Sequence, residues 1–240
     1  MTSQRFAAFP SEGLRFLRSL QRHNNREWFQ EHKGIYEEVV RRPMETLVLA
    51  LAEDFRQVAP ELVAAPKTSI YRIYRDTRFA KDKSPYKTHI AAVFPRRGLA
   101  KHQGAGLYLQ IASSEVLIGG GVYMPMPEDL KAVRDHIAGN IRKFRSIIEG
   151  KAFRKMFGQL SGDQLSRVPR GYAVDHPAAE YLKYRQYLAG RNLDSGIATQ
   201  NSFYKTILET FRTMMPLIRF LNEPVVRNQR VRDRQDSVLS

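Results

Sequence analysis

Apolar residues recur at helical spacing through the first sixty residues of the chain. Leu14, Leu17 and Leu20 fall on one face of a first predicted helix. Asn25 stands where a second helix begins and is predicted to be its N-cap, because its side chain can accept a hydrogen bond from a free backbone N–H. Pro43 suits the first turn of a third helix, where its missing N–H needs no partner. The N-terminal region is therefore predicted to be helical.

The middle of the chain changes to a two-residue period. Its apolar segments are short and rich in β-branched and aromatic residues, which is typical of strands. Because no helical stretch separates them, an antiparallel sheet is favoured, with a hairpin turn at Ser113-Ser114. The predicted strands are Ser69–Tyr74, His89–Phe94, Gly106–Ala112 and Glu115–Tyr123.

Helical spacing returns in the second half of the chain. Pro216 is expected to kink or end the last helix, because proline removes a backbone hydrogen bond. From Glu223 onward the sequence is polar and poorly periodic, so residues 223–240 are predicted to be a disordered tail. The elements predicted before the tail are a helical stretch from Pro127 to Ile148, an irregular loop over 158–176, a short helix over 177–184, a strand over Tyr187–Arg191, and a helix from about Ser202 to Met215.

These elements predict an α+β fold. The antiparallel sheet occupies the middle of the chain and is flanked by N-terminal and C-terminal helices. No internal repeat and no low-complexity linker divides residues 6–222, which are therefore predicted to form a single domain.

The composition excludes several kinds of chemistry. None of the 240 residues is cysteine, which rules out disulfides, thiol nucleophiles and cysteine-ligated metal sites. The six histidines form no compact ligand motif, no GxSxG nucleophile elbow occurs, and no metal or other cofactor is predicted. The sequence shows neither the apolar stretch of a signal peptide nor a segment that could span a membrane, so a cytoplasmic protein without membrane contact is expected.

Positive charge is concentrated in one stretch of the chain. The net charge is +15 at pH 7, and residues 67–101 hold ten lysines and arginines against only Asp76 and Asp82. This local excess of +8 creates a field that favours phosphate-bearing partners. An anion-binding surface is predicted here, and a merely solvated basic face is the simpler alternative.

The most unusual segment is IYRIYRDTRFAKDKSPYKTH, residues 70–89. In an extended strand Arg72 and Arg75 point to opposite faces, whereas a reversal at Ser84-Pro85 brings the two sides of the following loop together. Arginine offers a fork of donors that suits phosphate, and lysine adds point charges. In the competing interpretation the two aspartates pair with these arginines and merely hold the loop together. The predicted anion-binding residues are Arg72, Arg75, Arg78, Lys83, Lys87 and, from a later loop, Arg170.

Five motifs are long or unusual enough to compare with known families: NNREWF (24–29), RIYRDTRFAKDKSPYK (72–87), GGG (119–121), VPRGY (168–172) and DHPAAEYL (175–182). Together they resemble an uncharacterised microbial and fungal family, the domain of unknown function 2461. The resemblance covers roughly Phe6 to Leu221 and leaves out the polar tail. It implies that these stretches are shared features of the family, and it implies no activity, cofactor or catalytic residue.

Two of these motifs invite a chemical interpretation. Gly119-Gly120-Gly121 lacks the GxxxxGK[ST] pattern of a phosphate loop, and glycines at a strand end more often allow a bulge or close backbone packing. Asp175-His176 has the composition of a catalytic dyad, but Asp175 in front of Pro177 is better explained as a helix cap.

The preferred function is the binding of a phosphate-bearing or polyanionic ligand. Nucleic acid or a nucleotide is the leading candidate because charge dominates such affinity. Aromatic rings that could stack on bases are also interleaved with the cations. These rings belong to Tyr71, Tyr74, Phe79 and Tyr86.

Two alternatives stay open from the sequence. One is a phosphoester-directed enzyme that binds its substrate with the same cations and takes Glu27, Asp76, Asp82 or Glu180 as a base. The other is a domain that recognises an acidic protein partner. The sequence identifies no catalytic residue, and it decides neither whether the protein is an enzyme nor its oligomeric state.

Overall fold

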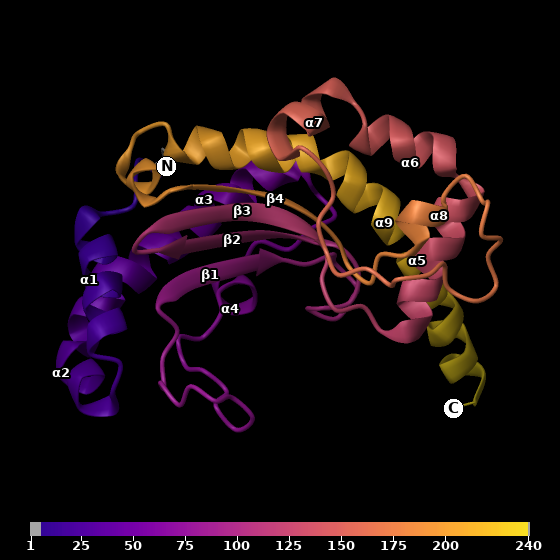
Figure 1. The fold of residues 1–240 in the computed structure, drawn as a ribbon. Coiled ribbons are helices and arrows are strands. Elements are labelled where there is room, and N and C mark those ends of the chain that lie inside the picture. The colour runs from indigo at the N-terminus through magenta and orange to yellow at the C-terminus, as the bar shows by residue number, and fades with distance from the viewer. Residues whose placement is uncertain (1–5, 240) are drawn as a thin grey trace. The chain divides into compact units, whose positions relative to one another are not determined.

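The computed structural model describes residues 6–239, with side chains described through residue 233. It is α+β, with helices toward both ends of the chain and one four-stranded antiparallel sheet in the middle, which confirms the predicted fold class. The strands pair in chain order, β1-β2-β3-β4 (Figure 1). They are β1 (His89–Phe94), β2 (Gly106–Ala112), β3 (Glu115–Val122) and β4 (Tyr187–Asp194).

The helices fall into an N-terminal group before the sheet and a larger group after its third strand, β3. Within the described residues, none of them has both the length and the apolar character needed to cross a membrane. Before the sheet lie α1 (Ser11–Arg22), α2 (Arg26–Tyr36), the π-helix η1 (Glu37–Arg41), α3 (Arg42–Val58) and α4 (Pro66–Ser69). After β3 lie α5 (Pro127–Gly139), α6 (Ile141–Ile148), α7 (Lys151–Phe157), α8 (Ala179–Leu182), the 3-10 helix η2 (Ser195–Thr199) and α9 (Phe203–Leu239).

Backbone contacts divide the chain into two compact units. Four elements supply residues to both units: strands β2, β3 and β4 and helix α9. The single domain predicted at residues 6–222 stays a prediction. Within the described residues, the first unit draws on 6–94, 108–118 and 192–209, and the second on 95–107, 119–191 and 210–239.

The N-terminal helices form as their apolar spacing predicts. Leu14, Leu17 and Leu20 are all buried along one face of α1. The side chain of Asn25 accepts a hydrogen bond from the Trp28 backbone N–H at 2.9 Å, which confirms the predicted N-cap of α2. Pro43 lies in the first turn of α3, as expected.

The strands at 89–94, 106–112, 115–122 and 187–194 confirm four of the five that were predicted. The prediction of a strand over Ser69–Tyr74 is wrong. Ser69 ends the short helix α4, and the residues that follow make only isolated antiparallel bridges, Ile70 with Ala92 and Tyr74 with Tyr86. Ile70 and Ile73 are both buried although they are three residues apart, so the segment bends and loses the two-residue alternation of a strand.

The stretch predicted as helical between Pro127 and Ile148 consists of two helices. Helix α5 ends at Gly139, and α6 starts at Ile141. Between them Asn140 leaves the helical conformation, with φ −132° and ψ 34°, and its side-chain amide donates to the His136 carbonyl at 2.9 Å. The amide thereby satisfies a carbonyl that the end of the helix leaves free.

The three consecutive glycines of β3 permit close backbone packing. A Cβ on Gly120 would lie 2.5 Å from the Gly106 carbonyl oxygen, and one on Gly121 only 1.9 Å from that of Tyr187. Gly121 also has φ +129°, a conformation that favours glycine. The prediction that these glycines serve packing is thereby confirmed.

Helix α9 does not end at Pro216, which was expected to kink or end it, and it also passes through Pro224. It continues to Leu239, through most of the segment 223–240 that was predicted to be a disordered tail. The side chains of Leu217, Leu221 and Val225 are buried, and this burial offsets the backbone hydrogen bonds that the prolines remove.

Candidate functional site

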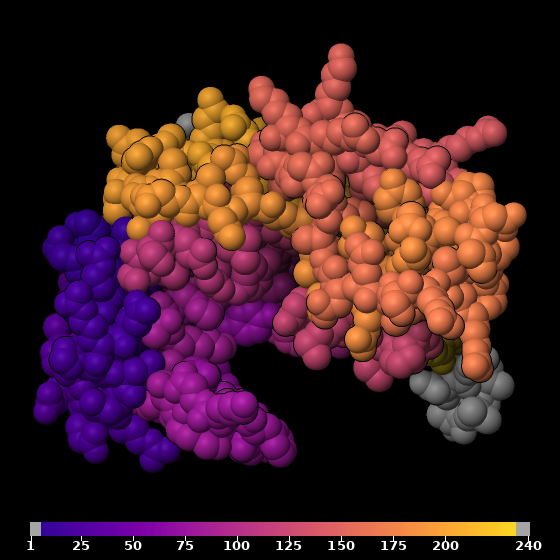
Figure 2. Space-filling view, in the orientation of Figure 1, coloured from indigo at the N-terminus to yellow at the C-terminus, as the bar shows by residue number. Residues whose placement is uncertain are grey.

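Residues 70–88 form a hairpin, here called the basic hairpin, that projects from the first unit (Figure 1). Its two arms are joined by backbone hydrogen bonds from Arg75 N–H to the Pro85 carbonyl at 2.9 Å and from Lys87 N–H to the Ile73 carbonyl at 2.8 Å. It holds six cationic and two anionic side chains, a net charge of +4. Figure 2 shows it as a lobe that stands out from the surface of its unit.

The NNREWF motif fastens this hairpin at its base. Asn24 donates from its side-chain amide to the Tyr86 carbonyl and accepts from the Tyr86 N–H, both at 3.0 Å, as a neighbouring strand would. Phe29 stacks on the fully buried Tyr86 ring, with centroids 4.1 Å apart. This role of Asn24 was not predicted, because only its neighbour Asn25 carries the recognisable signal of a helix cap.

Two of the predicted anion-binding residues form ion pairs within the hairpin. Asp76 accepts hydrogen bonds from Arg78 at its backbone N–H (3.2 Å), Nε (3.0 Å) and Nη2 (2.7 Å). Asp82 accepts from Ser84 and from Nη1 of Arg75. These are the internal pairs that the competing interpretation predicted.

The same contacts keep both aspartates ionised. The Arg78 hydrogen bonds lower the pKa of Asp76 to about 2. The pKa of Asp82 is also lowered, first by the Ser84 hydroxyl and then by Arg75. A carboxylate with so low a pKa is a weak base, so neither aspartate suits the role of a general base.

The two predicted lysines bind backbone carbonyls. Lys83 Nζ donates to the Thr77 carbonyl at 3.0 Å, across the turn of the loop. Lys87 Nζ donates to the Arg72 carbonyl at 3.1 Å and lies 5.0 Å from the centroid of the Tyr71 ring. Burial, followed by the nearby Arg72 charge, lowers the pKa of Lys87. An ammonium group has three donors, so each lysine keeps hydrogen-bonding capacity for a ligand.

The remaining cations of the hairpin face solvent. Arg72 and Lys81 are exposed, and neither forms an ion pair with any described residue. The hairpin thus brings together five of the six predicted anion-binding residues. Arg170 is also exposed, but it belongs to the loop between α7 and α8 in the second unit. Anion binding by all six stays a prediction.

The Asp175-His176 pair lies just before α8, which has no side-chain cap. Nδ1 of His176 accepts a hydrogen bond from the Ala178 N–H at 3.0 Å, whereas Asp175 is exposed and caps no helix of the described chain. The predicted cap by Asp175 is therefore wrong. Glu180, one of the four carboxylates considered as a base, is paired with Lys183 at 2.6 Å.

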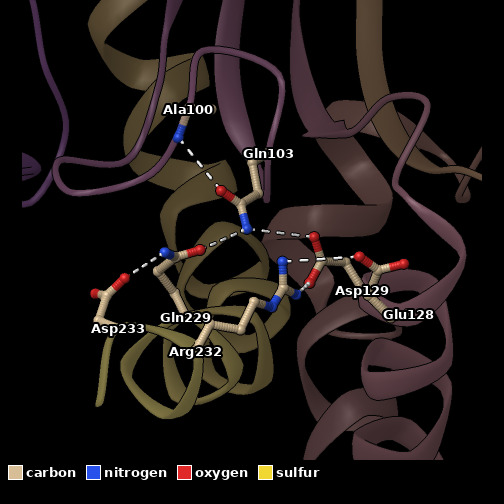
Figure 3. A network of polar contacts seen from close by, with 7 residues as sticks. All are labelled: Ala100, Gln103, Glu128, Asp129, Gln229, Arg232 and Asp233. Carbon is tan, nitrogen blue, oxygen red and sulfur yellow. Dashed lines mark hydrogen bonds and ion pairs between the residues drawn. The ribbon is translucent and has the colours of Figure 1, made fainter. Parts of the chain in front are cut away.

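One buried carboxylate was not predicted. Asp129 of α5 is 1% exposed, and its two oxygens meet Arg232 Nη2 at 2.7 Å and Gln103 Nε2 at 3.4 Å (Figure 3). Gln103 also donates to Gln229 at 3.1 Å. A buried carboxylate without a partner is costly, so Asp129 favours the conformation in which Arg232 reaches it. The network thereby holds the C-terminal part of α9 against α5. No local pattern in the sequence indicates it, since Arg232 stands in the segment predicted to be disordered.

The fold and the basic hairpin define the class of protein, and a family comparison gives its family. The antiparallel sheet and the basic hairpin define an α+β protein with an exposed cationic ribbon. Residues 12–220 match the family described as "Conserved hypothetical protein (DUF2461)", and the chain belongs to that family. The resemblance of its motifs is thereby confirmed. A search of curated proteins gave no match.

Among the described residues, no group of three or more histidine, aspartate or glutamate side chains could hold a metal ion.

Proposed function

We propose that the protein binds nucleic acid through the basic hairpin. The observation that carries this proposal is the hairpin's net charge of +4 on a projecting ribbon, on which four of the six cations stay exposed after its internal pairs are formed: Arg72, Arg78, Lys81 and Lys83. Arg78 is 77% exposed at its side chain although it is paired with Asp76. Exposed ion pairs contribute little to stability, so a phosphate can compete for the same guanidinium groups.

The form of the hairpin favours a polymer over a mononucleotide. Its cations lie along both arms and around the turn, with Arg72 on the first arm, Lys81 in the turn and Lys87 on the second arm. A chain of phosphates gains from cations that follow its backbone, and the ions released from it add to the affinity. A single small ligand instead requires groups that converge on one point.

The enzyme alternative has less support. Asp76 and Asp82 are held as carboxylates by their ion pairs, and Glu180 is paired with Lys183. An acidic protein partner shares the same electrostatic attraction, so the test must separate it from nucleic acid.

Fluorescence anisotropy with a labelled oligonucleotide at two salt concentrations tests the proposal. We expect the Arg72→Ala/Lys81→Ala variant to bind more weakly. The slope of its log Kd against log salt concentration should also be smaller, by about 0.7 for each phosphate of a single strand that the variant no longer neutralises. Arg142→Ala/Lys155→Ala is the matched control, because it removes two exposed cations from α6 and α7. Equal losses in both variants, or no salt-sensitive binding by the wild type, would refute the proposal. Binding to polyglutamate but not to oligonucleotide would favour the acidic partner.

A further inference from the structure

The turn of the basic hairpin displays one aromatic ring almost completely to solvent. Phe79 is 96% exposed, more than any other large hydrophobic side chain of the described residues. Isolated exposed apolar residues are common on protein surfaces. What distinguishes Phe79 is its setting, because the Arg78 guanidinium lies 5.9 Å from its ring centroid in a loop of high positive charge.

The loop that carries Phe79 is held in shape on both sides. Asp76 binds the backbone and the guanidinium of Arg78, immediately before the ring. After the ring, Lys83 reaches back to the Thr77 carbonyl at 3.0 Å. An aromatic side chain on a loop ordered in this way loses little conformational entropy when a partner covers it.

Rings and cations alternate along the hairpin. Tyr71 lies under the Lys87 ammonium, Tyr74 is 45% exposed, and Phe79 stands beside Arg78. A nucleic acid strand presents the complementary series of flat bases and phosphates, and proteins that bind single strands combine the same two kinds of group.

We propose that Phe79 stacks on an unpaired base, so that the ligand of the basic hairpin is single-stranded nucleic acid; this inference rests on the proposed function. In a duplex the base faces are covered by their neighbours, and a ring at the end of a loop reaches them only where the strand is open. An anionic membrane would also attract cations beside an apolar ring. The hairpin suits a membrane less well, because its exposed rings are few and its cations follow both arms.

The test compares Phe79→Ala with Phe79→Trp, which keeps a larger stacking surface. The probes are a single-stranded oligonucleotide containing 2-aminopurine, the same sequence as a duplex, inorganic polyphosphate, and vesicles of phosphatidylcholine and phosphatidylserine. Because the side chain is 96% exposed, both variants should keep the melting temperature of the wild type. Stacking predicts that Phe79→Ala weakens single-strand binding by roughly 5- to 150-fold. It also predicts that polyphosphate binding is unchanged and that Phe79→Trp restores the affinity and the 2-aminopurine quenching.

The other outcomes separate this inference from the proposed function. If the wild type binds single strand and duplex equally and Phe79→Ala changes neither, stacking is refuted and electrostatic nucleic-acid binding stands. If the wild type binds no nucleic acid, both are refuted. Binding to the anionic vesicles alone, abolished in Phe79→Ala, would assign the hairpin to a membrane surface instead.

Discussion

The attachment of the basic hairpin to the segment just before α2 can be tested by changing one of two adjacent asparagines. Asn24 makes two hydrogen bonds to the Tyr86 backbone, while the side chain of Asn25 is directed to α2, which it caps at Trp28. Asn24→Ala removes both bonds to Tyr86 at a partly buried position. At about 0.5–1.5 kcal/mol for each bond, it should ease opening of the hairpin by about 1–3 kcal/mol.

Amide hydrogen exchange followed by NMR measures this opening. The informative amides are those of Arg75 and Lys87, which bond across the hairpin and are not themselves partners of Asn24. Their exchange should become roughly 5- to 150-fold faster in Asn24→Ala, whereas amides in β1 should change much less. Asn25→Ala is the control. It should destabilise α2 by about 1 kcal/mol without a selective effect on the hairpin.

Two results would refute this reasoning. If Asn24→Ala leaves exchange at Arg75 and Lys87 unchanged, the side chain does not hold the hairpin in place. If it speeds exchange to the same extent in β1, the variant is destabilised globally, and the hairpin does not open as a separate unit.

Three further predictions concern contacts away from this attachment. Asn222 is 4% exposed and bonds both backbone groups of Ala105 at 2.8 and 2.9 Å. Asn222→Ala leaves two buried backbone groups without partners, at about 1–3 kcal/mol each. It should therefore lower the unfolding free energy by roughly 2–6 kcal/mol in urea titrations, and a change below the fitting error would contradict this. Gly121→Ala places a Cβ against backbone at 1.9 Å, so it should lower the melting temperature or the soluble yield markedly, while Gly139→Ala, with open space, should not. Because the pKa of Asp76 is lowered from 3.8 to about 2, the contribution of its carboxylate to hairpin order is complete above pH 3.8 and is lost as the pH falls through about 2. Carboxyl NMR titration should show this pKa, and Arg78→Ala should raise it toward 3.8; a value unchanged in the variant would exclude the ion pair as its cause.

Much of the fold could be predicted because local chemistry and tertiary packing agree. The leucine stripe of α1 and the cap at Asn25 depend on neighbours a few residues away, and both are as predicted. The alternation in β2 works the same way, since Leu107, Leu109 and Ile111 all turn to the buried side. These elements carry their signal within one short window of sequence.

Other parts depend on partners far away in the sequence. Helix α9 continues past its prolines because apolar side chains such as Val225 are buried, and because Arg232 reaches Asp129, 103 positions earlier. No local pattern indicates that contact. Residues 69–74 have the composition of a strand, but burial of both Ile70 and Ile73 imposes a bend. In each case tertiary packing overrides local propensity.

In the candidate site, too, local features could be predicted and distant contacts could not. Its charge could be predicted, and so could the alternative that Asp76 and Asp82 hold the loop together, because both follow from residue types within one segment. The attachment by Asn24 and the display of Phe79 at the turn required the structure.

The internal ion pairs and the proposed ligand do not exclude one another. Without a ligand, the six cations of the hairpin repel each other, and Asp76 and Asp82 relieve that repulsion while fixing the directions of Arg78 and Arg75. Because water and salt screen exposed pairs, the guanidinium groups are held in place without being tightly bound. Arginine has five donors, so one paired with a carboxylate can still donate to a phosphate. The aspartates therefore order the hairpin for a ligand, and the net charge of +4 that remains supplies the attraction.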